Sequence, residues 1–483
     1  MQFLLAWFVI GFICGEGIAQ SQADLAESPK TNVLFILVDD LGWKDLGSYG
    51  SSFYDTPNID RLAADAVRFT DTYAAHPVCS PTRAAIMTGK DPVRVGITDW
   101  IPGMPTERAI DPGLVTPEDI HNLPLDEVTM AEAFRQQGYR TFFAGKWHLG
   151  ETSDYWPEAQ GFDINKGGHH KGSPPGGYYA PYENPELEDG PDGEYLTDRL
   201  TEESIRFIEE RGEEPFFLFL SFYTVHTPIQ GCRRYDDHYR KKQQKLANQV
   251  EVETRKEHNG QTRLSQGNPR YAAMVRCMDQ NVGRVLDALR ERDLYEHTII
   301  VLTSDNGGLS TLPPDRGPAP TAVTPLRAGK GWAYEGGIRV PLIVKAPGLP
   351  VGKVSRQPVT SMDYYPTLLE LAGLPLENDQ HVDGQSLVPY LQNPQKVERR
   401  TLVWHYPHYH GSAWRPGSAI RVDKWKLMEF YESGVTELYN LENDLGEQDD
   451  LSGKYPEKKE QLRSMMHEYI DTRGGKYPTP VDK

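Results

Sequence analysis

The sequence predicts an α/β protein with a large mixed, mostly parallel β-sheet sandwiched by helices, plus a smaller C-terminal antiparallel sheet subdomain packed with a helix. Continuous apolar runs at 33–38, 216–222 and 298–303 are typical of strands buried on both faces. The stretch 271–292 instead carries its apolar residues on one stripe, which is typical of a helix packed on a sheet. After residue 387, shorter strand-like runs replace this pattern and indicate a second architecture.

The length of 483 residues, 38% of them apolar, is enough for a large core and suggests more than one domain. We expect a main α/β domain at 30–395 and a C-terminal α+β subdomain at 396–483. Short strands of that subdomain are predicted at 401–404, 418–421, 425–428 and 437–439, followed by a polar helix at 457–469.

The first 19 residues resemble a secretory signal peptide. The apolar run 4–14 is too short to span a bilayer as a helix, and the small residues 17–19 follow at the usual cleavage spacing. Cys14 suggests a lipoprotein as an alternative, but residues 11–13 make a poor lipoprotein motif. We therefore expect a secreted or periplasmic protein with no membrane span in the mature chain.

Polar residues follow four of the apolar runs at the point where each predicted strand ends. The fourth of these runs, at 141–144, is shorter than the others. In open α/β sheets, ligands bind beyond the carboxyl ends of the strands, so these side chains are expected to meet at one edge. They are Asp39, Asp40, Lys146, His148, His226, Asp305 and Asn306.

Four of these residues form an all-oxygen set. Carboxylate and amide oxygens at strand ends suit Ca²⁺, with Mg²⁺ as the runner-up, and zinc is disfavoured because no His/Cys set has ligand-like spacing nearby. An Asp pair after a strand can also simply cap a turn or helix. That alternative is weakened because a second strand ends in Asp-Asn. The predicted ligands are Asp39, Asp40, Asp305 and Asn306.

Cys79 begins the segment Cys-Ser-Pro-Thr-Arg, and Pro81 in the first turn predicts a helix that starts at the cysteine. The stretch 77–89 resembles the first signature of the type I, formylglycine-dependent sulfatases, an arylsulfatase-like family of the alkaline phosphatase superfamily. The stretch 138–150 is similar to the second signature, and 327–337 is similar to a sulfate-binding segment of that family. A buried cysteine without a chemical role is the alternative for Cys79.

The resemblance implies a particular chemistry. A formylglycine-generating, sulfatase-maturing enzyme would oxidise Cys79 to formylglycine (3-oxoalanine), whose oxygen joins the four metal ligands. One hydroxyl of the hydrated aldehyde would attack sulfur, with Asp305 as the activating carboxylate, and the other would expel sulfate with His148 as base. His226 would protonate the leaving oxygen. Charge on the sulfuryl group would be stabilised by Arg83, Lys146 and Lys330.

The net charge of −18 argues against nucleic acid and anionic membranes as partners. A sulfated substrate remains compatible with it if the cations Arg83, Lys146 and Lys330 share one pocket. Apart from Cys79 and the signal region, the chain has Cys232 and Cys277, which could form one disulfide or remain two buried thiols.

Size and composition favour a sulfated glycan over a small aryl sulfate as substrate, and among glycans we expect galactose or N-acetylgalactosamine sulfates. Aromatic and histidine side chains suit sugar faces and hydroxyls, so possible substrate-binding residues are His169, His170, His405, His408 and His410. A surface loop with aromatic packing is the alternative for 405–410. The long segment 167–194 is expected to be a surface loop near the pocket mouth. For 231–268, a solvated surface is the default interpretation, and a helix plus a mobile loop is the alternative.

Two further functions stay open at this level. Some phosphate or phosphonate monoester hydrolases of the same superfamily also use formylglycine. The set Lys146, His148 and Lys330 argues for sulfate, and rates on matched sulfate and phosphate esters would separate the two functions. A catalytically silent glycan-binding homologue would keep Cys79 unmodified.

Overall fold

The structure is a computed structural model that describes residues 30–109, 111–247 and 253–481. Residues Thr31–Lys483 form one compact unit, which contains all the helices and strands named below. The predicted signal peptide at 1–19 lies outside the described residues. Among the described residues, no helix is both long and apolar enough to cross a bilayer.

The main sheet has nine strands and is mixed but mostly parallel, as the sequence predicted. Its order is β12-β2-β11-β9-β1-β6-β4-β5, and β13 pairs with β2. Among the strands that the structure describes, only β11 runs antiparallel to its neighbours, β2 and β9. The strands are β1 (Asn32–Val38), β2 (Val67–Tyr73), β4 (Arg140–Gly145), β5 (Ile164–Lys166), β6 (Phe216–Phe222), β9 (Thr298–Ser304), β11 (Arg339–Lys345), β12 (Lys353–Ser355) and β13 (Val359–Thr360).

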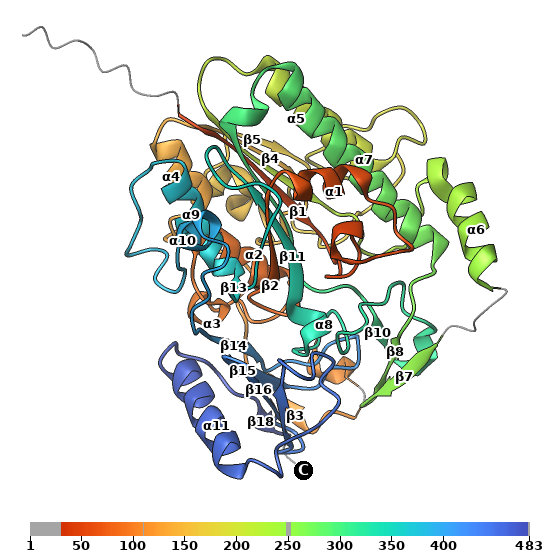
Figure 1. Cartoon of the computed structure of the whole chain (residues 1–483), viewed down its shortest axis with the longest axis vertical. Helices are drawn as coiled ribbons and strands as arrows, with labels where there is room; N and C mark the ends of the chain where they lie inside the picture. The colour runs from red at the N-terminus through yellow and green to blue at the C-terminus, as the bar shows by residue number, and fades with distance from the viewer. Residues whose placement is uncertain (1–29, 110, 248–252, 482–483) are drawn as a thin grey trace, which may run out of the picture. The chain divides into compact units, whose positions relative to one another are not determined.

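Helices cover both faces of this sheet (Figure 1). Successive side chains of a strand point to opposite faces, so β1 contributes Leu34 and Ile36 to one core and Val33 and Phe35 to the other. This double burial explains why its sequence is apolar without alternation. The first core includes α1 (Pro57–Ala64), α5 (Leu196–Glu210) and α7 (Pro269–Glu291); the second includes α2 (Cys79–Thr88), α4 (Met130–Gln136), α9 (Tyr364–Leu371) and α10 (Val388–Gln392).

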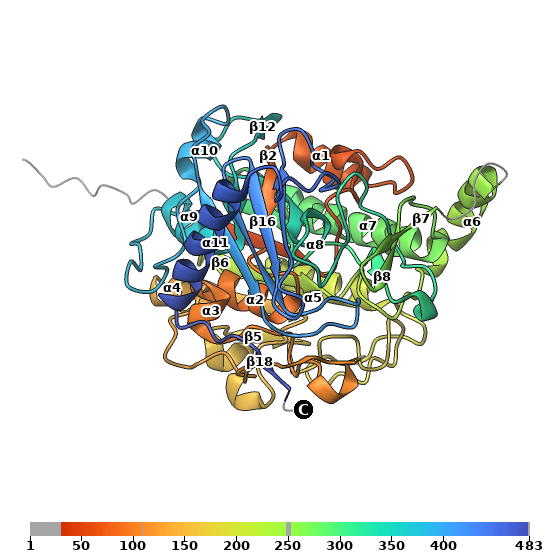
Figure 2. The ribbon, with the colours of Figure 1, turned by 90° about the horizontal axis from the view of Figure 1, so that it is seen from below.

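The C-terminal part forms the predicted antiparallel sheet and helix. The strands β14 (Thr401–Tyr406), β15 (Gly417–Val422), β16 (Trp425–Phe430) and β17 (Thr436–Asn440) pair in chain order. One face packs on α11 (Pro456–Asp471), which lies along the sheet in Figure 2. The other face packs on aromatic residues next to α8 (Glu335–Ile338) and thereby contacts the part of the chain that forms the main sheet.

One prediction needs correction in the segment 231–268. The predicted helix is present as α6 (Arg233–Ala247), but the expected mobile loop contains the hairpin β7 (Thr254–Glu257) and β8 (Gly260–Arg263), which is extended by β10 (Thr311–Leu312). Both hairpin strands are rich in charged and polar residues, so no apolar alternation marked them in the sequence. Smaller elements are α3 (Pro92–Val95) and the pair β3 (Leu114–Val115) and β18 (Thr479–Pro480).

Cys232 and Cys277 lie in contact as buried free thiols. A hydrogen bond with Cys277 lowers the pKa of Cys232. The sequence left open a disulfide between these cysteines or two separate buried thiols. The structure shows two buried thiols that lie next to each other.

Candidate active site

The four predicted strand ends converge at one edge of the main sheet. β1, β4, β6 and β9 are parallel neighbours, so their carboxyl ends lie side by side. The residues that follow β1 and β9 are fully buried, and so is Lys146 after β4. Asp40 and His148 both have positive φ angles, of 61° and 60°, a conformation that non-glycine residues rarely adopt and that is frequent at functional sites.

Three cations pair with three carboxylates at this edge. Lys146 Nζ lies 2.8 Å from Asp39 Oδ2. Lys330 Nζ lies 2.6 Å from Asp40 Oδ1, a carboxylate oxygen that also accepts a hydrogen bond from the Asn306 amide at 2.8 Å. Arg83 approaches Asp305 through both Nε and Nη2, at 2.9 and 2.8 Å. The predicted metal ligands and the predicted sulfate-binding cations thus form one connected cluster.

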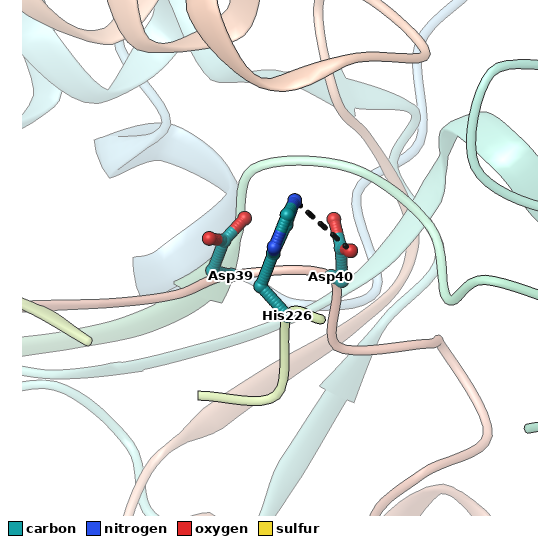
Figure 3. A group of neighbouring side chains, drawn as sticks. All are labelled: Asp39, Asp40 and His226. Carbon is teal, nitrogen blue, oxygen red and sulfur yellow. Dashed lines mark ion pairs between the residues drawn. The ribbon is translucent and has the colours of Figure 1, made fainter. Parts of the chain in front are cut away.

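Two oxygens in this cluster fit a cation. Asp39 Oδ1 and Asn306 Oδ1 are buried and accept no hydrogen bond from any described residue. An unsatisfied buried oxygen is costly, and a hard cation such as Ca²⁺ satisfies oxygen ligands of this kind. Asp39, Asp40 and His226 also bring ligand atoms within 4.8 Å of one another, with His226 Nε2 3.9 Å from Asp40 Oδ2 (Figure 3).

Cys79 occupies the first position of α2 and is buried. Its Sγ lies 3.3 Å from His148 Nδ1, while His148 Nε2 contacts the carbonyl oxygen of Ile101. A carbonyl oxygen only accepts hydrogen bonds, so Nε2 carries the hydrogen in the neutral ring and Nδ1 is left as an acceptor. The ring therefore presents a basic nitrogen to the side chain at position 79.

The histidines of the cluster are poised in the neutral form. Burial, reinforced by Lys330, lowers the pKa of His226 to about 3. Burial and then Lys146 lower the pKa of His148 well below its usual value. Burial also raises the pKa of the Cys79 thiol, so the unmodified side chain is a poor nucleophile at neutral pH.

The carboxylates respond unequally to the same surroundings. Burial raises the pKa of Asp39 well above its usual value, more than Lys146 lowers it. For Asp40, burial is outweighed by Lys330 and His226, and its pKa falls below the usual range. Burial likewise opposes ionisation of Asp305, but Arg83 and Lys146 hold the pKa of Asp305 below its usual value.

A cavity of about 890 Å³ opens above this cluster and reaches Cys79, His148, His226 and Lys330. Part of its wall is the segment 170–173 of the long loop after β5, which places this part of the predicted loop at the pocket. A Cβ at Gly172 would lie 2.3 Å from His148 Cε1, so only glycine allows the loop to approach the ring this closely.

The five histidines proposed as sugar ligands divide into two groups. His170 and His410 line the cavity, whereas His169, His405 and His408 do not. The His405 ring contacts Ser418 Oγ and the carbonyl oxygen of Lys476, and His408 contacts Thr98 Oγ1. Sequence reasoning missed other lining residues, among them Trp100, Arg108, Lys171 and Arg316, because no short motif marks them.

The comparison with known protein families agrees with this geometry. The family described as "Sulfatase" matches residues 31–374, and the family described as "N-sulphoglucosamine sulphohydrolase, C-terminal" matches 328–474. The chain therefore belongs to the sulfatase family and is an enzyme that hydrolyses sulfate esters.

Particular relatives are similar over most of the chain. A sulfatase of Formosa agariphila is 31% identical, over 93% of this chain and 89% of that protein. The N-acetylgalactosamine-6-sulfatase of Canis lupus familiaris is 32% identical over 76% of this chain and 67% of its own length. A solved structure, the crystal structure of Ps i-CgsB in complex with k-i-k-neocarrahexaose, superposes on this chain with a TM-score of 0.71 and a sequence identity of 31%. The match covers 91% of this chain and 93% of the Ps i-CgsB chain.

Proposed function

We propose that the protein is an exported sulfatase that removes sulfate from a sulfated carbohydrate, with galactose or N-acetylgalactosamine units as the expected sugars. The observation that carries this proposal is the position of Cys79. It stands at the start of α2, beside the basic nitrogen of His148, in a cavity that also contains Lys330 and His226. The names of two similar proteins, an N-acetylgalactosamine-6-sulfatase and one solved with a neocarrahexaose, support a sulfated sugar.

We further propose that a maturation enzyme converts Cys79 to formylglycine, and that Ca²⁺ is the resident metal with Mg²⁺ as the alternative. The ligands would be Asp39, Asp40, Asp305 and Asn306, of which Asp39 and Asn306 each have an unsatisfied oxygen. The hydrated aldehyde would supply two hydroxyl groups on one carbon, and a bound metal would supply positive charge that stabilises the sulfuryl group.

The residues of the chain then have separate tasks. Lys330 lines the cavity, whereas Lys146 is fully buried outside its lining, and both ammonium groups lie near enough to act electrostatically on the side chain at position 79. Their positive charge can therefore stabilise a sulfuryl group bound there, together with the charge of the metal. Arg83 holds Asp305 through two contacts and also donates to the carbonyl oxygen of Lys146 at 2.7 Å. It therefore fixes the activating carboxylate and the position of the lysine together.

Protons move at two histidines. His148 Nδ1 faces position 79 and can accept a proton from the side chain there when sulfate is released. His226 Nδ1 lies 2.8 Å from the carbonyl oxygen of Thr227 and so carries a hydrogen. A second proton on Nε2 would make that ring cationic, and the anionic sulfate ester favours this form. In this arrangement His226 delivers the proton to the leaving oxygen, with Lys330 beside it.

The test begins with the mass of the proteolytic peptide that contains Cys79, from protein made in a host with a sulfatase-maturing enzyme. We expect the mass of the aldehyde, and sulfate release from sulfated galactose or N-acetylgalactosamine measured by ion chromatography. Matched phosphate esters should react more slowly. A fully converted protein that releases no sulfate from any of these esters, or prefers phosphate, would refute the proposal.

A further inference from the structure

A second cavity of about 700 Å³ continues from the catalytic cavity. Its walls come from the β7–β8 hairpin, the turn 313–316 and the loop 409–415 between β14 and β15. The two cavities share Met104, Arg108, Arg316, His410 and Gly411. Each volume lies in the range of about 300–1,000 Å³ that holds a drug-sized ligand, so together they accommodate more than one sugar unit.

The second cavity is basic although the chain as a whole is acidic. Four basic residues line it, against the two acids Asp111 and Asp315, in a chain of net charge −18. Cations gathered in a recess raise the local concentration of anionic ligands more than the same charges spread over a surface. The basic residues are Arg108, Lys256, Arg316 and Arg415.

Three of these cations are available to a ligand. Arg415 pairs with Glu432. The side chains of Arg108, Lys256 and Arg316, in contrast, make no ion pair or hydrogen bond with any residue that the structure describes, and all three are exposed. Arg108 and Arg316 stand at the junction of the two cavities, and Lys256 lines the second cavity alone.

We propose that the second cavity is a subsite for a neighbouring sugar unit that bears its own anionic group, either a sulfate or a carboxylate. This inference rests on the proposed function, because it assumes that a sulfated sugar occupies the first cavity. The enzyme then acts on an oligosaccharide in which the sugar beside the reacting one is also charged. Lys256 and Arg316 bind that second charge.

The test measures binding rather than turnover. The Cys79→Ala variant is titrated calorimetrically with three probes: a carrageenan hexasaccharide, which carries sulfates; a hyaluronan hexasaccharide, which carries only carboxylates; and N-acetylgalactosamine 6-sulfate. The variants Lys256→Ala and Arg316→Ala are combined in this background. The matched control is Arg399→Ala, whose side chain is 87% exposed and lies outside both cavities.

We expect at least one hexasaccharide to bind more tightly than the monosaccharide. The combined variant should weaken that binding by about tenfold, since each exposed ion pair that is lost is worth up to about fivefold. The dependence on salt concentration should also become shallower, and the control should bind like its parent. Whichever hexasaccharide shows the loss identifies sulfate or carboxylate as the second charge.

Lys256→Arg keeps the charge and should retain the affinity, which separates charge recognition from damage to the hairpin. Hexasaccharide binding that is no tighter than monosaccharide binding, or is unaffected by the combined variant, overturns the proposed subsite. Failure of the proposed function has a different signature. In that case the converted wild-type protein releases no sulfate from any ester, whether or not the hexasaccharides bind to the Cys79→Ala variant.

Discussion

Replacing Lys426 by methionine should destabilise the protein far more than replacing Lys424 by methionine. Lys426 on β16 is fully buried between two buried carboxylates, with Nζ 3.0 Å from Glu335 and 2.7 Å from Glu447. Removing one partner of a buried ion pair leaves an uncompensated charge and costs about 3–5 kcal/mol. Lys424 is the matched control, because its partly exposed pair with Glu442 is worth at most about 1 kcal/mol.

The assay is urea unfolding followed by tryptophan fluorescence for both variants and the wild type. A difference between the two variants of less than about 1 kcal/mol would refute the reasoning, because it would place the Lys426 pairs in the weak class of exposed ion pairs. Adding Glu447→Gln to Lys426→Met should recover part of the loss. Glu335 keeps Arg339 as a partner at 2.8 Å, whereas Lys426 is the only ion-pair partner of Glu447 among the described residues.

Three further outcomes are expected at the active site. Cys79→Ala should abolish sulfate release while its circular dichroism and melting midpoint stay close to those of the wild type; retained turnover would contradict the role of the side chain. Asp305→Asn should lower the rate by about 100-fold or more and weaken calcium binding, and an unchanged calcium titration would exclude Asp305 as a ligand. Chelation should lower the melting midpoint and calcium should restore it, with magnesium less effective; a midpoint insensitive to both ions would exclude a resident metal at the unsatisfied oxygens of Asp39 and Asn306.

The strands that carry the active site could be predicted because a strand buried on both faces has an uninterrupted run of apolar residues. The run 33–38 is apolar at every position, and the polar pair Asp39-Asp40 marks where burial in the sheet ends. Parallel neighbours then bring their carboxyl ends together without further information from the sequence. The hairpin β7–β8 left no such pattern, because neither of its strands contains a large apolar side chain.

The histidines near residue 405 show where side-chain direction escaped prediction. The strand was expected to end at residue 404, but β14 continues to Tyr406. Side chains alternate along a strand, so Trp404 and Tyr406 pack toward the main domain, while Val403 packs toward α11. His405 follows the direction of Val403 and contacts the ring of Tyr477, away from the cavity. Only after the strand ends does the chain bring His410 to the catalytic cavity.

The position of the charges also refines the argument from the sequence about an acidic protein with an anionic substrate. Arg83, Lys146 and Lys330 do share one site, but each faces a carboxylate of the same site, so the six side chains carry no net charge when all are ionised. Attraction for a sulfate ester therefore requires charge from elsewhere. The unsatisfied oxygens of Asp39 and Asn306 offer a place for a divalent cation, and Arg108 and Arg316 add unpaired charge at the cavity wall. We therefore propose that the carboxylates serve the substrate indirectly, by holding the lysines in place and by binding a cation that would make the pocket positive.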